Sequence, residues 1–590
     1  MSAPLARLGA SARKALLVGA LAALVAGVDC VRWIRPALLL DSDASWAPAR
    51  LVLALFVGAA AALAGGVAAA GFLLWSRIPA AGEPLPPLAL SAGTRAAVAT
   101  AAILAGAALR FAALASVPEP LWVDDVSLIR PTLALRARPA DFADTTRDAP
   151  YGVAKPFGSV GVLYLQAYRA SLRLWGTTVF GVRFPSALAG TVSLVTATLL
   201  GRALLPAGGG ALAALILAGL RWHLILSRWA WVMIALAPLV DVATLLLLAA
   251  RRRRSSGLAC AAGIAAGVGA HVYLSAWPAA AALGLFALWP EESRGGLRDR
   301  LARAALFAAG FAIAAAPLFL FHAGRRAPYF ARTADHNVLL EIARTRSVLP
   351  PVAAAADAVA APWLLPDPTP RHDLPDRVRL DPLLALAVAI AFGRALLRPR
   401  DAVSALLLAH AAAVLAAVAA GGQADHPNGA RFAYLSSLAA VAGAAGTLWL
   451  TGLFSPARRR AAALAAVGAL AIGAALGARD ALLLWPERPE TFRSFHGQDT
   501  LLGRAAARWD TLGRVEIAPG VGHSPLAIEA VFAYRLDPSP FVRAGARRLG
   551  RIRIVDARAA PEEGERVVER IQDPLGSPVA AVLARRGDGT

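Results

Sequence analysis

The chain has 590 residues, of which 58% are hydrophobic, and a formal net charge of +22. In a soluble protein this charge would indicate nucleic-acid binding, but here the arginines gather between long apolar segments, as at residues 251–254 and 458–460. This is the positive-inside pattern of membrane proteins, so the sequence excludes DNA or RNA binding and predicts a polytopic membrane protein. Cys30 and Cys260 lie far apart, so no disulfide framework or cysteine-based metal site is expected.

About thirteen apolar runs have the length and composition of membrane spans. The first follows basic residues as a signal peptide would, but no cleavage site and soluble domain come after it, so we expect a retained helix. The predicted spans are residues 15–28, 51–75, 96–117, 184–205, 211–226, 230–250, 258–276, 277–289, 302–321, 382–397, 402–420, 432–454 and 461–478.

The basic loops fix the expected sidedness. From a cytoplasmic N-terminus, this count places residues 251–254, 294–303, 398–400 and 458–460 inside. Counting the amphipathic residues 164–175 as a span would invert all four loops, so we expect that segment to lie along the membrane interface. The loops 118–182 and 322–381 and the C-terminal tail are then extracytoplasmic.

Three regions are predicted: extra transmembrane helices in residues 1–95, a transmembrane catalytic module in 96–478, and an extracytoplasmic domain in 479–590. The tail has mixed charge, with strand-like runs at 551–555 and 579–583 around a helix-like stretch at 562–571. The expected fold class is therefore an all-α polytopic membrane protein with a small C-terminal α/β domain.

An acidic pair, Asp124 and Asp125, follows the predicted span 96–117, where a helix would leave the membrane. Two adjacent carboxylates raise one pKa, which suits a general base that takes a proton from an acceptor hydroxyl. The alternative is that Asp124 caps a helix that starts at Val126. The pair alone does not decide between these interpretations.

Two cations on the same predicted side could bind a phosphate. Lys155 is one of only two lysines and lies in the outer loop that also carries the acidic pair. Arg431 lies in the short loop HPNGARFAY, among other outward-facing arginines that together suit an anionic lipid-linked substrate. Contact with lipid headgroups is the alternative for both residues.

Several motifs resemble the membrane glycosyltransferases of the C superfamily, which include protein O-mannosyltransferases and the lipid A aminoarabinose transferase. Residues 121–125, LWVDD, look like the family's acidic pair after its first core helix, with Asp in place of Glu. Residues 174–190 contain LWG and GVRFPSALAG and are the most specific match. Ser227-Arg228, 370–375 and 426–431 resemble three further family segments, so the likeness spans about residues 96–455.

The resemblance implies that Asp124 is the catalytic carboxylate, that Lys155 meets the carrier phosphate, and that Arg228 belongs to the substrate site. Lys155 is followed by Pro156 and Phe157, where the aminoarabinose transferases have Lys-Pro-Pro. Ala154 replaces a family Glu, and Met233 lies in an apolar stretch where an acid is often found. These departures speak against a bound divalent metal, and no other cofactor is predicted.

The sequence thus predicts a glycosyltransferase in the plasma (inner) membrane. Its partners would be a polyprenyl-phosphate-linked sugar, membrane lipids and a lipid, glycan or protein acceptor, and no nucleic acid. Asp124 or Asp125 would activate the acceptor hydroxyl, and Lys155 with Arg228 and Arg431 would bind the leaving phosphate. The alternatives are a lipid or solute transporter and a non-catalytic member of the same fold.

Overall fold

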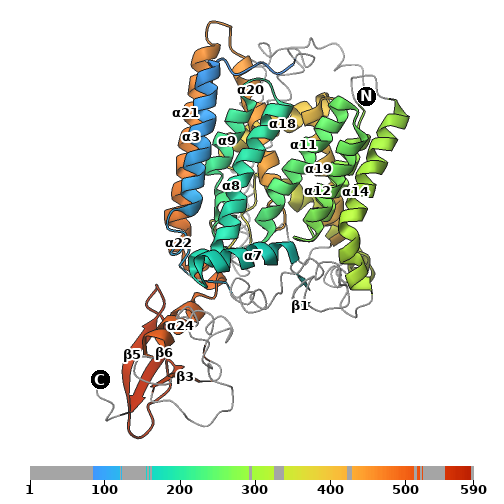
Figure 1. Cartoon of the computed structure of the whole chain (residues 1–590). Helices are drawn as coiled ribbons and strands as arrows, with labels where there is room; N and C mark the ends of the chain where they lie inside the picture. Colours follow the sequence, from blue (N-terminus) through green and yellow to red (C-terminus); the bar gives the residue numbers. More distant parts are fainter. Residues whose placement is uncertain are drawn as a thin grey trace, which may run out of the picture.

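The computed structural model shows a helical bundle joined to a small sheet near the C-terminus (Figure 1). It describes residues 84–119, 121–122, 154–155, 158–159, 162–230, 232–290, 296–323, 338–347, 349–421, 428–509, 515–518, 521 and 552–585. The predicted spans 15–28 and 51–75 and the acidic pair lie outside these residues.

Within the described ranges, six helices are long and apolar enough to cross a membrane. They are α3 (Ala92–Phe111), α8 (Val179–Leu204), α11 (Leu236–Arg253) with the preceding turn η2 (Val232–Ala235), α14 (Leu297–Ala323), α20 (Leu435–Gly452), and α21 (Arg459–Arg479) with its continuation to Glu487.

Five further apolar helices correspond to predicted spans, but none of them by itself meets the length and composition criterion for crossing a membrane. Helices α18 (Pro382–Leu397) and α19 (Ala402–Gly421) are bent by 101° relative to each other and would make a seventh span if counted together. Helices α9 (Gly209–Gly219), α12 (Ser256–Ala270) and α13 (Ala276–Leu288) are shorter than the roughly 20 residues that a bilayer requires. The chain is a multi-pass helical protein. Eleven of the thirteen predicted spans lie in the described part, and six or seven spans meet the length criterion there.

Small residues allow the helices to approach closely. Helix α9 is buried on all sides, between α3, α8, α20 and α21. A Cβ added at Gly219 would overlap the backbone of Ala474 in α21. In the same way, a Cβ at Gly263 or Gly310 would overlap the facing backbone where α12 packs on α14. Such contacts replace the hydrophobic effect as the source of helix association in lipid.

The predicted interfacial segment forms helix α7 (Val162–Trp175), which lies across the bundle at one end (Figure 1). Tyr164, Leu165 and Tyr168 are buried against the bundle, while Leu174 and Trp175 are exposed. The short hairpin of β1 (Ala154–Lys155) and β2 (Gly158–Ser159) lies at the same end. We call this the α7 end of the bundle.

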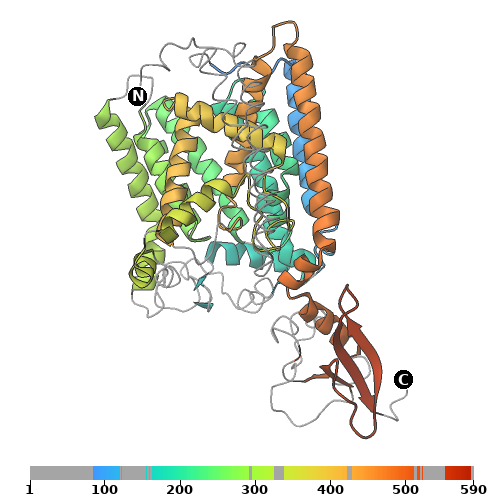
Figure 2. The same ribbon diagram turned by 180° about the vertical axis from the view of Figure 1, so that it is seen from behind.

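The opposite end of the bundle is the one where α3 and α21 begin (Figure 2). There, a common cavity is lined by arginines from three basic turns, namely Arg251, Arg252, Arg254, Arg303, Arg398 and Arg400. We call this the basic end. The clustering follows the arrangement that the positive-inside pattern predicts.

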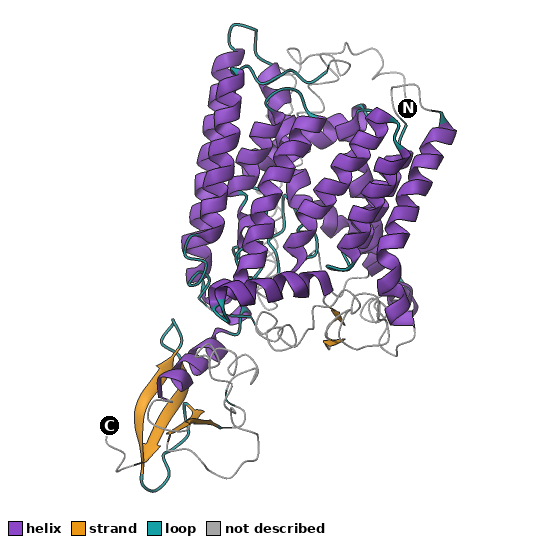
Figure 3. Ribbon diagram, viewed as in Figure 1, coloured by secondary structure: helices purple, strands orange, loops and turns teal. Residues whose placement is uncertain are grey.

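The C-terminal part combines helix α24 (Gly497–Trp509) with a four-stranded sheet (Figure 3). The strands are β3 (Val515–Ile517), β4 (Ile552–Asp556), β5 (Glu565–Gln572) and β6 (Pro578–Arg585), in the spatial order β3-β4-β6-β5. Strand β3 is parallel to β4, and the other pairs are antiparallel. Leu502 and Ala506 of α24 pack against Ile554 and Val582 of the sheet.

One prediction for this part is wrong, because the helix-like stretch 562–571 contains strand β5. Its charged residues suggested a helix, but Val567 and Ile571 pack against apolar residues of the sheet while the backbone pairs with β6. Pairing with a neighbouring strand overrides a weak local preference.

Candidate functional site

The chain just before the acidic pair is held by the C-terminal segment. The Leu121 N–H donates to Thr500 Oγ1 over 3.1 Å, and both residues are buried. Glu119 and Arg504 add an ion pair that is about half exposed, and such pairs contribute little stability. Asp124 and Asp125 lie outside the described residues, but the chain that leads to them is anchored on α24.

Trp122 lies two residues before Asp124 and connects two further segments. The guanidinium of Arg371 stacks over its indole ring, with Cζ 3.6 Å from the ring centroid. His496 meets the same ring edge-on, with 5.0 Å between centroids. Arg371 also donates to the Ser494 carbonyl over 2.5 Å. The acidic-pair loop, the 361–381 loop between α17 (Leu349–Ala360) and α18, and the C-terminal segment therefore meet at one residue.

An aromatic cluster packs next to the contacts that Trp122 makes with Arg371 and His496. Trp229 lies parallel to His372 at 6.2 Å and edge-on to Phe495 at 5.4 Å between centroids. Phe495 in turn contacts Trp485, whose Nε1–H donates to the Pro370 carbonyl over 2.7 Å. Because Trp229 and Trp485 are fully buried, the cluster fixes the base of the 361–381 loop.

Asp367 ties the 361–381 loop to the loop that carries Arg431. Its carboxylate accepts hydrogen bonds from Arg379 Nη2 at 2.8 Å, the Gly429 N–H at 2.7 Å and the Thr369 N–H at 2.9 Å. Burial would raise the pKa of Asp367, but the interaction with His372 Nδ1 at 3.3 Å, the positive charge of Arg379 and the Thr369 N–H lower it below its usual value. Asp367 is thus held as a carboxylate that organises both loops.

His372 and Asp373 are buried next to Asp367. Burial lowers the pKa of His372, which the hydrogen bond to Asp367 only partly opposes. Burial also raises the pKa of Asp373, against the attraction of Arg221, whose Nε donates to its carboxylate over 2.6 Å. Arg221 begins helix α10 (Arg221–Leu226), so this ion pair fixes the loop to the bundle.

Arg431 is half-buried in a loop whose shape is set by the same contacts. Its backbone N–H donates to the Asn428 carbonyl over 3.0 Å, and the Gly429 carbonyl accepts from Trp222 Nε1 over 3.1 Å. The Gly429 N–H is bound by Asp367. The predicted cation therefore lies in a loop that is tied, through the 361–381 loop, to Trp122.

Arg228 lies in the protein interior. Its Nη1 donates to the carbonyls of Leu109 and Arg110, and its Nη2 to those of Ala112 and Val117, over 2.5 to 3.3 Å. These carbonyls end α3 and continue toward the acidic pair. The guanidinium therefore holds the C-terminal end of α3 in place.

Lys155 lies in strand β1 at the α7 end, with its backbone paired to Gly158 of β2. Its side chain is outside the described atoms. In the part of the chain that the structure describes, no three His, Cys, Asp or Glu side chains lie close enough to hold a metal ion.

The sequence motifs at residues 121–125 and 370–375 predicted a resemblance to the family but no individual role for Trp122, Arg371, Asp367 or His372. Their importance comes from contacts between segments that are distant in sequence, such as Trp122 with Arg371 and Asp367 with Gly429. A signal was present, because an aromatic residue and an arginine each occurred in a motif that resembled the family.

Comparison with known proteins supports the resemblance to membrane glycosyltransferases. Residues 159–320 match the model of a family described as dolichyl-phosphate-mannose-protein mannosyltransferase. The resemblance to C-superfamily membrane glycosyltransferases is confirmed. The match covers less than half of the chain, and it includes α7, α8 and Arg228. No curated protein matches the chain in sequence.

Two solved structures illustrate what the chain is similar to. ArnT from Cupriavidus metallidurans bound to undecaprenyl phosphate is 14% identical, with a TM-score of 0.49 over 85% of this chain and 100% of that chain. The apo oligosaccharyltransferase of Archaeoglobus fulgidus is 16% identical, with a TM-score of 0.44 over 76% of this chain and 60% of that chain.

Proposed function

We propose that the protein transfers a sugar from a polyprenyl-phosphate carrier to an acceptor hydroxyl on the extracytoplasmic side of the membrane. The family match over residues 159–320 is the observation that carries this proposal. It is supported by the arrangement at the α7 end, where the chain before the acidic pair meets the 361–381 loop, which holds the loop of Arg431.

In the proposed reaction, Asp124 or Asp125 accepts the proton of the acceptor hydroxyl. The hydroxyl oxygen forms a bond to the anomeric carbon, and the bond from that carbon to the phosphate oxygen breaks. The carrier phosphate leaves with the electron pair. Negative charge grows on the phosphate in the transition state, so cations placed beside it lower the barrier.

Lys155 and Arg431 are the proposed cations for the phosphate. Arg228 takes a positioning role in this proposal, because its four hydrogen bonds hold the end of α3 from which the acidic pair follows. Trp122 and Arg371 position the same loop from the other side.

The test is transfer of radiolabelled sugar from native polyprenyl-phosphate carriers in membranes that contain the wild-type protein or Asp124→Asn, Asp125→Asn or Lys155→Ala. We expect transfer by the wild type and its loss in at least one aspartate variant. If no donor gives transfer, or if all four proteins behave alike, the proposal fails in favour of a transporter or a non-catalytic protein of the same fold.

A further inference from the structure

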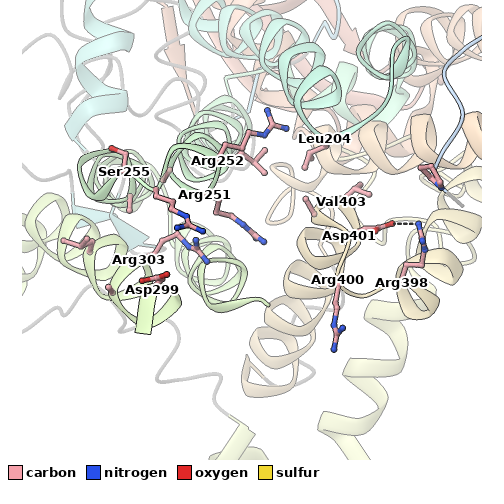
Figure 4. A pocket seen from close by; sticks show the side chains of 18 of the residues that line it. Leu204, Arg251, Arg252, Ser255, Asp299, Arg303, Arg398, Arg400, Asp401 and Val403 are labelled. Carbon is pink, nitrogen blue, oxygen red and sulfur yellow. Dashed lines mark ion pairs between the residues drawn. The ribbon is translucent and has the colours of Figure 1, made fainter. Parts of the chain in front are cut away.

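A second site lies at the basic end of the bundle, opposite α7 and the proposed catalytic loops. The end of α11, the start of α12, the first turns of α14 and the turn between α18 and α19 surround a cavity of about 960 Å³. Figure 4 shows Arg251, Arg303 and Asp299 on one side of it and Arg398, Arg400 and Asp401 on the other. None of its lining residues belongs to the proposed sugar-transfer machinery.

The cavity carries an excess of positive charge, because seven arginines and only two aspartates line it. One of those acids, Asp401, is shared between Arg394 at 3.0 Å and Arg398 at 3.6 Å. The arginines come from helices that are far apart in the sequence, so folding concentrates the charge in one place. Like charges around one cavity repel each other and favour a bound anion.

Some of these guanidinium groups are held in fixed positions. Arg251 is buried, donates to the Phe286 carbonyl over 3.1 Å and lies over the Phe286 ring at 4.2 Å. Arg303 Nε donates to the Ala287 carbonyl over 3.0 Å. A guanidinium whose orientation is already fixed loses less entropy when it binds a phosphate.

The guanidinium N–H groups of two other arginines are available to a ligand. In the described residues, the exposed side chains of Arg254 and Arg400 have no recorded hydrogen bond or ion pair with the protein. Arg254 ends α11 in a left-handed conformation, with φ of 51°, which places it at the turn that borders the cavity.

The surroundings of the cavity favour a lipid over a soluble anion. Leu248, Leu306 and Val403 line it together with the arginines. Leu297 and Leu301, on the adjoining first turns of α14, are exposed at 62% and 52%. This mixture suits a ligand that has a charged headgroup and apolar chains.

We propose that this cavity binds the headgroup of an anionic phospholipid, with the phosphate held by the arginines of the α11–α12 and α18–α19 turns. Arginine pairs with phosphate oxygens through two parallel N–H donors, which gives both strength and geometry. Basic cavities between transmembrane helices are a recurrent form of lipid-headgroup site. The proposal does not depend on sugar transfer.

The test uses the full-length protein in nanodiscs, with lipid binding measured by native mass spectrometry. Phosphatidylglycerol and cardiolipin are compared with phosphatidylcholine, and inorganic pyrophosphate and undecaprenyl phosphate are added as competitors. The test variant is Arg254→Gln with Arg400→Gln. The matched control is Arg253→Gln with Arg460→Gln, which removes the same charge from two exposed positions at the same end of the bundle that do not line the cavity.

We expect the wild type and the control to retain phosphatidylglycerol or cardiolipin in preference to phosphatidylcholine. The test variant should bind these lipids about 30-fold more weakly, because it lacks two arginines and each arginine near an anionic lipid contributes about 1 kcal/mol. Unfolding of all three proteins in phosphatidylcholine should coincide, since the four substituted positions are exposed.

Three results would overturn the proposal. Equal lipid loss in the test and control variants would show that the charge of this end acts without a defined site. Displacement of the lipid by pyrophosphate at equal concentration would assign the cavity to a soluble anion. Preferential retention of undecaprenyl phosphate would assign it to the carrier.

Discussion

The guanidinium of Arg371 lies 3.6 Å above the indole ring of Trp122, which lies two residues before Asp124. Arg371 donates at the same time to the carbonyl of Ser494. One side chain therefore joins the chain that leads to the acidic pair to the 361–381 loop and to the C-terminal segment. This junction explains why segments so distant in sequence would act together in the proposed reaction.

Replacing Arg371 by Gln should lower the rate of sugar transfer about 10- to 100-fold with little change in KM for the carrier. The reason is that a displaced loop would misplace the proposed catalytic carboxylate, and a shift of about 1 Å costs up to 100-fold. The measurement is steady-state transfer in proteoliposomes. Arg377→Gln is the control, because Arg377 is an exposed arginine of the same loop. Equal activity of the two variants would refute the positioning role.

Arg228 and Arg431 should respond differently to substitution. Arg228→Gln should lower the unfolding temperature as well as activity, since it leaves buried carbonyls at the end of α3 unsatisfied at a cost of about 1–3 kcal/mol. Arg431→Gln should raise KM for the carrier while the unfolding temperature stays near that of the wild type. Thermal unfolding and carrier titration on each variant separate the two effects. A normal unfolding temperature for Arg228→Gln would contradict the structural role.

The buried His372 should make the protein less stable in mild acid. Burial lowers its pKa below the ordinary value of 6.5, so the neutral form is favoured in the folded state. Below pH 6.5 the unfolded chain takes up a proton that the folded protein binds less readily, so stability falls as the pH falls, by at most about 1.4 kcal/mol per pH unit.

The measurement is thermal unfolding of the wild type and His372→Gln between pH 8 and pH 5. Asp367, Arg371 and Arg379 surround the imidazole and are present in both proteins. The unfolding temperature of the variant should therefore rise relative to that of the wild type as the pH decreases. A constant difference over this range would show that His372 is not buried as a neutral ring.

Gly310 should be intolerant of larger side chains, because a Cβ at this position overlaps the Cys260 carbonyl where α12 and α14 meet. Gly310→Val should lower the unfolding free energy by about 1–3 kcal/mol. Gly284→Val is the matched control, since nothing lies within 4 Å of a Cβ built there. Chemical unfolding in detergent compares the two variants, and equal stability would mean that the helices are not in close contact.

The sequence was sufficient for features that depend on local composition. Apolar run lengths predicted α3, α8, α14, α20 and α21, with ends that differ from the observed ones by up to about six residues. The basic turns predicted which segments share one end of the bundle. The amphipathic pattern of residues 164–175 predicted that this segment, helix α7, is not a membrane span. These features follow from the water–lipid boundary, which acts on each segment separately.

Tertiary structure decided the features that depend on partners. The sequence pattern predicted a helix where β5 lies, but the segment is a strand because β6 pairs with it. Arg228 is a conspicuous cation in sequence, but its donors hold the end of α3. Trp122, Arg371 and His496 become neighbours only when segments from three regions fold together. A local pattern records what a residue prefers, whereas packing determines which groups are available to satisfy it.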